Sequence, residues 1–203
     1  MLLIGGPSGI GKTIVAEQIG LQLGISWLQV DDLRLALQYS HPTVRAGTGA
    51  LHYFLRTPNV WDQPPERLRD GLIGVGEVMS PAIEIVVANH VGTAAPVVIE
   101  GDGILPSVVA CPLVHEHVSA GSVAAVFLIE SDERVLLDNM LLRRRGIAGR
   151  RGSELRVEAQ AKWLFGQWLA GEAHRHGLPV LEARPWSSLA ERILQASQAR
   201  GSG

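Results

Sequence analysis

A glycine-rich segment at residues 6–13, GPSGIGKT, matches the phosphate-binding loop pattern G-x-x-x-x-G-K-[ST]. Its glycines allow the backbone to turn so that successive N–H groups face an anion. Lys12 can reach the β- and γ-phosphates of a nucleotide, and the Thr13 hydroxyl can ligate Mg²⁺. We expect Lys12 to be exposed in the empty loop. The predicted nucleotide contacts here are Gly6, Ser8, Gly9, Ile10, Gly11, Lys12, Thr13 and Ile14.

Two aspartates follow the next apolar segment, in the sequence VDDLR. Ligands bind at the carboxyl ends of parallel strands, so Asp31 or Asp32 can accept the proton of an acceptor hydroxyl. Arg34, one helical turn further on, can hold an acidic group of the same molecule. The alternative is that one aspartate only caps the following helix.

A further carboxylate, Glu100, ends the apolar run APVVIE, and Asp102 follows two residues later. An apolar strand that closes on an acid is the arrangement that holds Mg²⁺ in phosphate-loop enzymes. Thr13 and Glu100 are therefore the predicted metal ligands, and Glu100 and Asp102 are predicted to contact the acceptor. A helix cap is again the alternative.

Residues 141–152, LLRRRGIAGRRG, place five arginines among three glycines. A cationic segment that closes over the phosphates stabilises the charge of a phosphoryl transition state and excludes water. We predict a lid here, with Arg143 and Arg150 as its catalytic cations. Which arginine touches phosphate is left open, and a solvated basic helix end is the alternative.

Five apolar runs at 1–4, 25–30, 95–100, 123–129 and 178–181 predict the strands that must position these groups. The segments between them are long enough for helices, which predicts a parallel sheet covered on both faces. The first helix should begin at Lys12 and stop at Gly24. Residues 1–203 form one domain in this prediction, with a substrate-binding insertion at 41–90. A helix should enter at Pro64 and Pro65 and be kinked or interrupted at Pro81.

The composition limits the partners. The 203 residues are 46% apolar and 19% charged, with a formal net charge of −2 and one cysteine. This balance gives no electrostatic case for binding nucleic acid or an anionic membrane, and the single thiol suits a reducing compartment. We expect a cytoplasmic protein. Within and just before the insertion, Arg34, Arg45 and Arg56 predict an acceptor that carries an acidic group. The alternative is that these arginines are solvated on the outer faces of the insertion's helices.

The order of landmarks along the chain resembles a known group. GGPSGIGKT, D-x-x-R at 31–34, VVIEGDGILP, the arginine-rich segment and LPVLEARPW follow one another. The series is similar to that of P-loop small-molecule kinases, which include shikimate and gluconate kinases, chloramphenicol phosphotransferase and zeta toxins. It most resembles 2-phosphoglycerate-kinase-like proteins, whose E-G after the third strand is similar to Glu100 and Gly101.

The resemblance implies an α/β fold, the P-loop NTPase three-layer sandwich, with a five-stranded parallel sheet of order 2-3-1-4-5. It implies MgATP as the donor and a role for Asp31 in orienting or deprotonating the acceptor. It also implies that Arg184, Pro185 and Trp186 lie beside the adenine, with Arg143 or Arg144 on its other face.

The leading hypothesis is therefore transfer of the γ-phosphoryl group of MgATP to a hydroxyl of a small, acidic metabolite. One alternative is an ATP-binding switch or interaction protein whose partner docks on residues 41–90. Another is a kinase that acts on an antibiotic or a nucleotide sugar. The identity of the acceptor and the oligomeric state are not predicted.

Overall fold

The computed structural model describes residues 1–39, 48–143 and 147–198. Five parallel strands form one sheet of order β2-β3-β1-β4-β5, as predicted. The strands are β1 (Leu2–Gly5), β2 (Ser26–Gln29), β3 (Val97–Gly101), β4 (Ala124–Ile129) and β5 (Val180–Glu182). Each lies within one or two residues of its predicted position.

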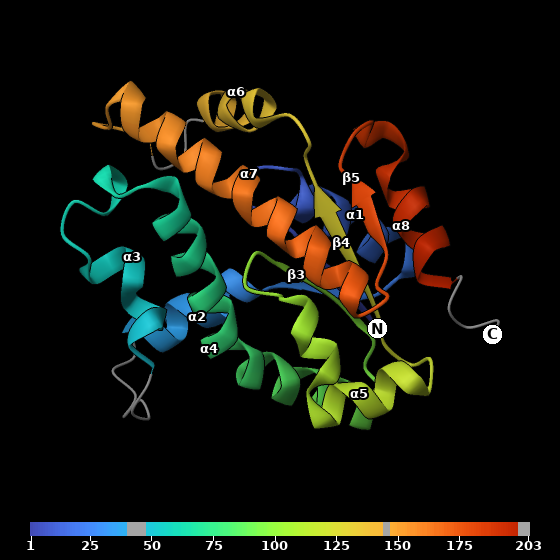
Figure 1. The fold of residues 1–203 in the computed structure, drawn as a ribbon. Coiled ribbons are helices and arrows are strands. Elements are labelled where there is room, and N and C mark those ends of the chain that lie inside the picture. The colour runs from blue at the N-terminus through green and yellow to red at the C-terminus, as the bar shows by residue number, and fades with distance from the viewer. Residues whose placement is uncertain (40–47, 144–146, 199–203) are drawn as a thin grey trace.

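Helices cover both faces of this sheet (Figure 1). Their bounds are α1 (Lys12–Leu23), α2 (Val30–Tyr39), α3 (Tyr53–Arg56), α4 (Pro65–Gly92), α5 (Pro112–Ser119), α6 (Glu133–Arg143), α7 (Gly152–Arg175) and α8 (Leu189–Gln198). Alternate residues of the strands point to opposite faces of the sheet and pack into two cores. Leu3 and Ile99 belong to the core that contains α4, and Leu2 belongs to the core that contains α1. The three-layer sandwich therefore follows from strands that are apolar on both faces.

The second strand is one residue shorter at its end than predicted. It stops at Gln29, and Val30 opens α2, with Asp31 and Asp32 in the first helical turn. Carboxylates are favourable in that turn because they face the positive end of the helix dipole. The two aspartates thus begin a helix and do not close the strand.

Helix α4 begins at Pro65, as predicted, but Pro81 does not interrupt it. Pro81 is exposed, and the opposite side of the helix is fixed by fully buried Met79, Ile83 and Val87. Burial of the residues before and after Pro81 thus outweighs the loss of the backbone hydrogen bond that a proline cannot donate. Among the described helices, α4 alone is long and apolar enough to cross a membrane, and here it is a core helix.

Candidate active site

A cavity of about 510 Å³ opens over the phosphate-binding loop and the carboxyl ends of β1 and β3. Gly9 and Gly11 both have φ 95°, a region that glycine adopts without strain, so the loop turns tightly into α1 at Lys12. Helix α1 therefore directs its positive N-terminus at the cavity. Of the predicted site residues, the cavity gathers Ser8, Gly9, Gly11, Lys12, Thr13, Ile14, Asp31, Glu100, Asp102, Arg143 and Trp186.

Lys12 differs from expectation. Its side chain is only 6% exposed, because Nζ donates a hydrogen bond of 3.0 Å to the carbonyl oxygen of Pro7. The ammonium is folded back onto its own loop, which satisfies one of its hydrogens. A phosphate that approaches the loop must compete with this internal bond.

Thr13 and Glu100, the predicted metal ligands, already contact each other. The Thr13 hydroxyl donates to Oε1 of Glu100 at 2.7 Å, and Glu100 is 4% exposed. Burial raises the pKa of Glu100, against the opposing effects of Lys12 and of the Thr13 hydrogen bond. Burial and the Asp31 charge also raise the pKa of Asp102.

The described residues contain no group of three His, Cys, Asp or Glu side chains placed to hold a metal alone. Two oxygen donors beside a phosphate site nevertheless fit Mg²⁺, which takes one or two protein ligands and completes its shell with phosphates and water. Thr13 and Glu100 are the residues that would hold it.

Of the two adjacent aspartates, Asp31 lines the cavity and Asp32 does not. Nη2 of Arg34 donates to Oδ1 of Asp31 at 3.2 Å, while Nη1 donates to Gln38 at 3.2 Å. Gln38 in turn donates to the backbone oxygen of Leu51 at 2.6 Å. The first turn of α2 is thereby tied to the segment that follows the undescribed residues 40–47, and Asp31 is held in a fixed orientation.

A second cavity, of about 180 Å³, adjoins the first. Arg34, Asp102, Glu158 and Lys162 supply its charges. The other lining residues are Ser8, Gly103 and Ala161, with an aromatic and aliphatic wall from the insertion made of Phe54, Trp61, Leu68, Leu72 and Val75. Ser8 and Asp102 line both cavities, so the two spaces meet at the loop and at the end of β3.

The remaining predicted residues are distributed as follows. Gly6 and Ile10 belong to the loop but are buried and line neither cavity, and Arg56 is exposed and lines neither. Arg150 also lines neither cavity. Arg45 and Arg144 lie outside the described residues.

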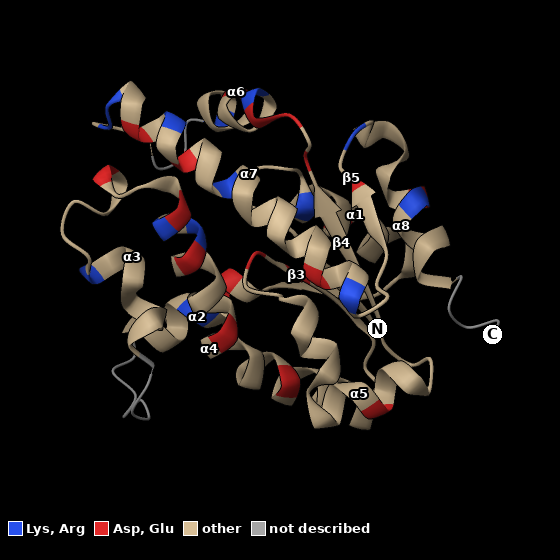
Figure 2. Ribbon diagram, in the orientation of Figure 1, with Lys and Arg blue, Asp and Glu red and all other residues tan. Residues whose placement is uncertain are grey.

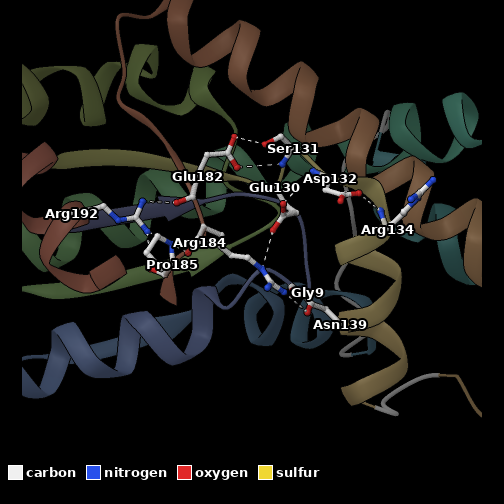
Figure 3. A network of polar contacts seen from close by, with 11 residues as sticks. Gly9, Glu130, Ser131, Asp132, Arg134, Asn139, Glu182, Arg184, Pro185 and Arg192 are labelled. Carbon is white, nitrogen blue, oxygen red and sulfur yellow. Dashed lines mark hydrogen bonds and ion pairs between the residues drawn. The ribbon is translucent and has the colours of Figure 1, made fainter. Parts of the chain in front are cut away.

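The segment predicted to lie beside the adenine is held by a polar network (Figure 3). The Arg184 guanidinium lies 4.9 Å from the Trp186 ring centroid, and its Nε is 3.5 Å from Oε2 of the buried Glu130. Its Nη2 reaches Oδ1 of Asn139 at 3.5 Å. Nδ2 of Asn139 donates to the Gly9 carbonyl oxygen at 3.0 Å, so α6 is joined to the phosphate loop.

Sequence reasoning missed Glu158 and Lys162, because no motif surrounds them in the middle of α7. A weak signal was present. Lys12 and Lys162 are the only lysines in a chain that otherwise uses arginine for its cations, and each lines a cavity.

No protein-family model matches the chain. A 2-phosphoglycerate kinase from Methanothermobacter thermautotrophicus is 28% identical over 194 residues, which are 90% of this chain and 60% of that protein. The chain thus spans about 60% of the length of this curated relative.

Among solved structures, a shikimate kinase from Acinetobacter baumannii in complex with shikimate aligns with a TM-score of 0.51 and 16% identity, over 100% of this chain and 94% of that one. A gluconokinase from Sinorhizobium meliloti 1021 aligns with a TM-score of 0.48 and 18% identity, over 99% and 92%. The chain therefore has the shikimate-kinase-like P-loop fold and a 2-phosphoglycerate kinase as a sequence relative, which confirms its resemblance to the P-loop small-molecule kinases.

Proposed function

We propose that this chain is an ATP-dependent phosphotransferase that acts on a hydroxyl of a small, acidic metabolite. The observation that carries the proposal is the pair of adjoining cavities that share Ser8 and Asp102. The larger cavity is lined by residues of the phosphate-binding loop, as a nucleotide site requires. The smaller cavity is lined by charged, aromatic and aliphatic side chains. A donor phosphoryl group and an acceptor hydroxyl can meet where they join.

In this proposal the loop amides and Lys12 bind the β- and γ-phosphates, and Thr13 and Glu100 hold Mg²⁺. The ion supplies neutralisation of phosphate charge. Arg143, at the exposed end of α6, lines the nucleotide cavity and is placed to add a cation. Trp186 lies against Gly11 at the rim of the same cavity and offers a stacking surface for adenine.

Asp31 is the residue we assign to the acceptor hydroxyl. As the acceptor oxygen forms its bond to the γ-phosphorus, the bond from that phosphorus to the β–γ bridging oxygen breaks. The hydroxyl proton passes to the Asp31 carboxylate, and ADP leaves. Arg34, which donates a hydrogen bond to Asp31 and lines the acceptor cavity, holds the carboxylate in its orientation.

The experiment that tests the proposal measures ADP release from MgATP in the presence of hydroxy acids, among them 2-phosphoglycerate, shikimate and gluconate, and of antibiotics and nucleotide sugars. We expect release to depend on one acidic acceptor. ADP release that is the same with and without every acceptor would instead support an ATP-dependent switch.

A substitution pair tests the assignment of the base. Asp31→Asn should lower kcat by about 10²–10⁴-fold with little change in nucleotide affinity, because it keeps the shape but removes the proton acceptor. Asp32→Asn is the matched control and should retain turnover, since Asp32 lines neither cavity. The reverse result would show that the two roles are exchanged.

A further inference from the structure

Arg150 was predicted to close over the phosphates, but its contacts lie elsewhere. Its side chain is 13% exposed just before α7, and the guanidinium carbon lies 4.0 Å from the Trp61 ring centroid. Nη1 donates to Oε2 of Glu158. Trp61 and Glu158 both line the acceptor cavity, whereas Arg150 lines neither cavity. The arginine thus supports the wall of the acceptor cavity from outside.

Glu158 connects this arginine to Lys162. Nζ of Lys162 is 2.6 Å from Oε1 of Glu158, one helical turn away on α7, and both side chains line the acceptor cavity. Figure 2 shows basic and acidic residues alternating along this half of α7. Burial alone would raise the pKa of Glu158, but Lys162 and Arg150 outweigh it, and the pKa is lowered.

The charges of this cluster do not cancel at the cavity. Glu158 is shared by two cations, and all three side chains are only 13–14% exposed. Glu154 is 3.8 Å from Nε of Arg150 but is bonded to Arg151. Because Glu158 also pairs with Arg150, it neutralises the Lys162 ammonium beside the cavity only in part, and water screens buried charges poorly.

We propose that Lys162 binds the acidic group of the acceptor and that Arg150 is a positioning residue that holds Glu158 and Trp61, and through them Lys162, in place. The inference rests on the proposed function, because it names how the acceptor of that reaction is recognised. Carboxylate and phosphate share the required chemistry, a compact anion that accepts hydrogen bonds from an ammonium.

The test uses the full chain with 2-phosphoglycerate as the probe and measures its Kd by calorimetry, its KM and kcat, and the Kd of MgADP. Lys162→Met should weaken probe binding by about tenfold or more, the loss expected for a charge-assisted hydrogen bond. Arg150→Met should raise the probe KM by about fivefold, more than it lowers kcat, with the MgADP Kd within about twofold. Arg150→Lys should restore part of the loss, because it returns the charge next to Glu158 without the planar fork.

Arg151→Met is the matched control. Arg151 is the exposed neighbour, pairs with Asp62 and Glu154, and lines neither cavity, so its removal should leave the probe KM within about twofold. If Arg150→Met fails to fold, Trp61→Leu takes its place: it should raise the probe KM, and Trp61→Phe, which keeps a flat ring beneath the guanidinium, should raise it less.

Three results would overturn the inference. A loss of MgADP affinity in Arg150→Met, with the probe KM unchanged, would make Arg150 a phosphate contact. Equal losses in every parameter together with a lower Tm would make its role only structural. Lys162→Met protein that binds both MgADP and the probe as tightly as the wild type would refute recognition of the acid by Lys162, and the nucleotide site would stand. The proposed function fails separately, if no acceptor stimulates ADP release.

Discussion

At the scale of single residues, a hydrogen bond that Lys12 makes within its own loop bears on how the loop would bind phosphate. The ammonium of Lys12 makes a hydrogen bond to the Pro7 carbonyl and is nearly buried. In the proposed site, phosphate would replace this neutral acceptor with a charged one. The exchange is favourable because the ammonium then faces an opposite charge, and the attraction is strong where water screens it poorly.

We therefore expect Lys12→Ala to weaken nucleotide binding by about 1.5–3 kcal/mol, with a larger loss in the transition state. Calorimetry with MgADP and the rate of ADP release measure the two effects. Because the side chain is buried, a small fall in Tm should accompany them. Wild-type turnover in a folded Lys12→Ala protein would contradict the phosphate site.

Asp102 predicts a pH effect on stability. Burial and the Asp31 charge raise its pKa in the folded state, so the folded protein binds the proton more tightly than the unfolded chain does. The ionised carboxylate thus costs stability above its folded pKa, and that cost disappears as the pH falls through it. Asp102→Asn should raise Tm at pH 8, by about 2–4 °C for each kcal/mol recovered, and the gain should shrink toward pH 5.

Thermal unfolding across that pH range measures the difference, with exposed Asp138→Asn as the control. An Asp102→Asn protein whose Tm lies below that of the wild type at pH 8 would show that the ionised carboxylate is not destabilising.

Local pattern explains which site residues sequence reasoning could find. The loop lysine and threonine are fixed by one contiguous motif, and Glu100 by its place at a strand end. The partners of Lys162 and Arg150 could not be found in this way. Their position depends on how α7 packs against Trp61, which lies 89 residues before Arg150 in the chain, and no short-range spacing encodes that contact.

At the scale of elements, glycine marks where helices approach their neighbours. A Cβ on Gly76 of α4 would lie 2.6 Å from Cγ of Leu105, which is 1% exposed and cannot move aside. A Cβ on Gly171 of α7 would meet nothing within 4 Å. Helix α4 therefore depends on its glycine for close packing, and α7 does not depend on Gly171.

Gly76→Ala should destabilise the fold by about 1–3 kcal/mol, because the core is overpacked. Gly171→Ala should stabilise it by about 0.5–1 kcal/mol, because alanine loses less entropy in a helix interior. Urea unfolding of both variants measures the difference. Equal effects of the two substitutions would contradict the close contact between α4 and Leu105.

The positions of the strands and helices were predictable where a single sequence signal dominated. Apolar runs located all five strands, and Gly24 and Pro65 located helix ends. The structure differed from the prediction where two signals competed: Val30 is β-branched, yet it opens a helix whose first turn suits two acids. Pro81 is a helix breaker, yet it lies in a helix whose other side is buried.

At the scale of the whole molecule, nucleotide binding should raise the thermal stability of the folded protein. A ligand at about 100 times its Kd adds about 2.7 kcal/mol, so MgADP should raise Tm by about 5–10 °C. MgGDP should raise it less, because no N-K-x-D guanine motif is present and Trp186 offers stacking alone. Thermal unfolding with each nucleotide measures the preference, and an equal or larger shift with MgGDP would contradict ATP as the donor.

The shared walls at Ser8 and Asp102 also have a consequence for inhibitor design. Since the two cavities share these lining residues, the proposed function predicts that one compound that joins an adenosine polyphosphate to a small anion can reach both. Binding of the second half then becomes intramolecular, and the effective concentration set by a short linker adds avidity without a new contact. The small cavity, whose wall comes from the insertion, would give such a compound its selectivity among proteins that share the phosphate loop.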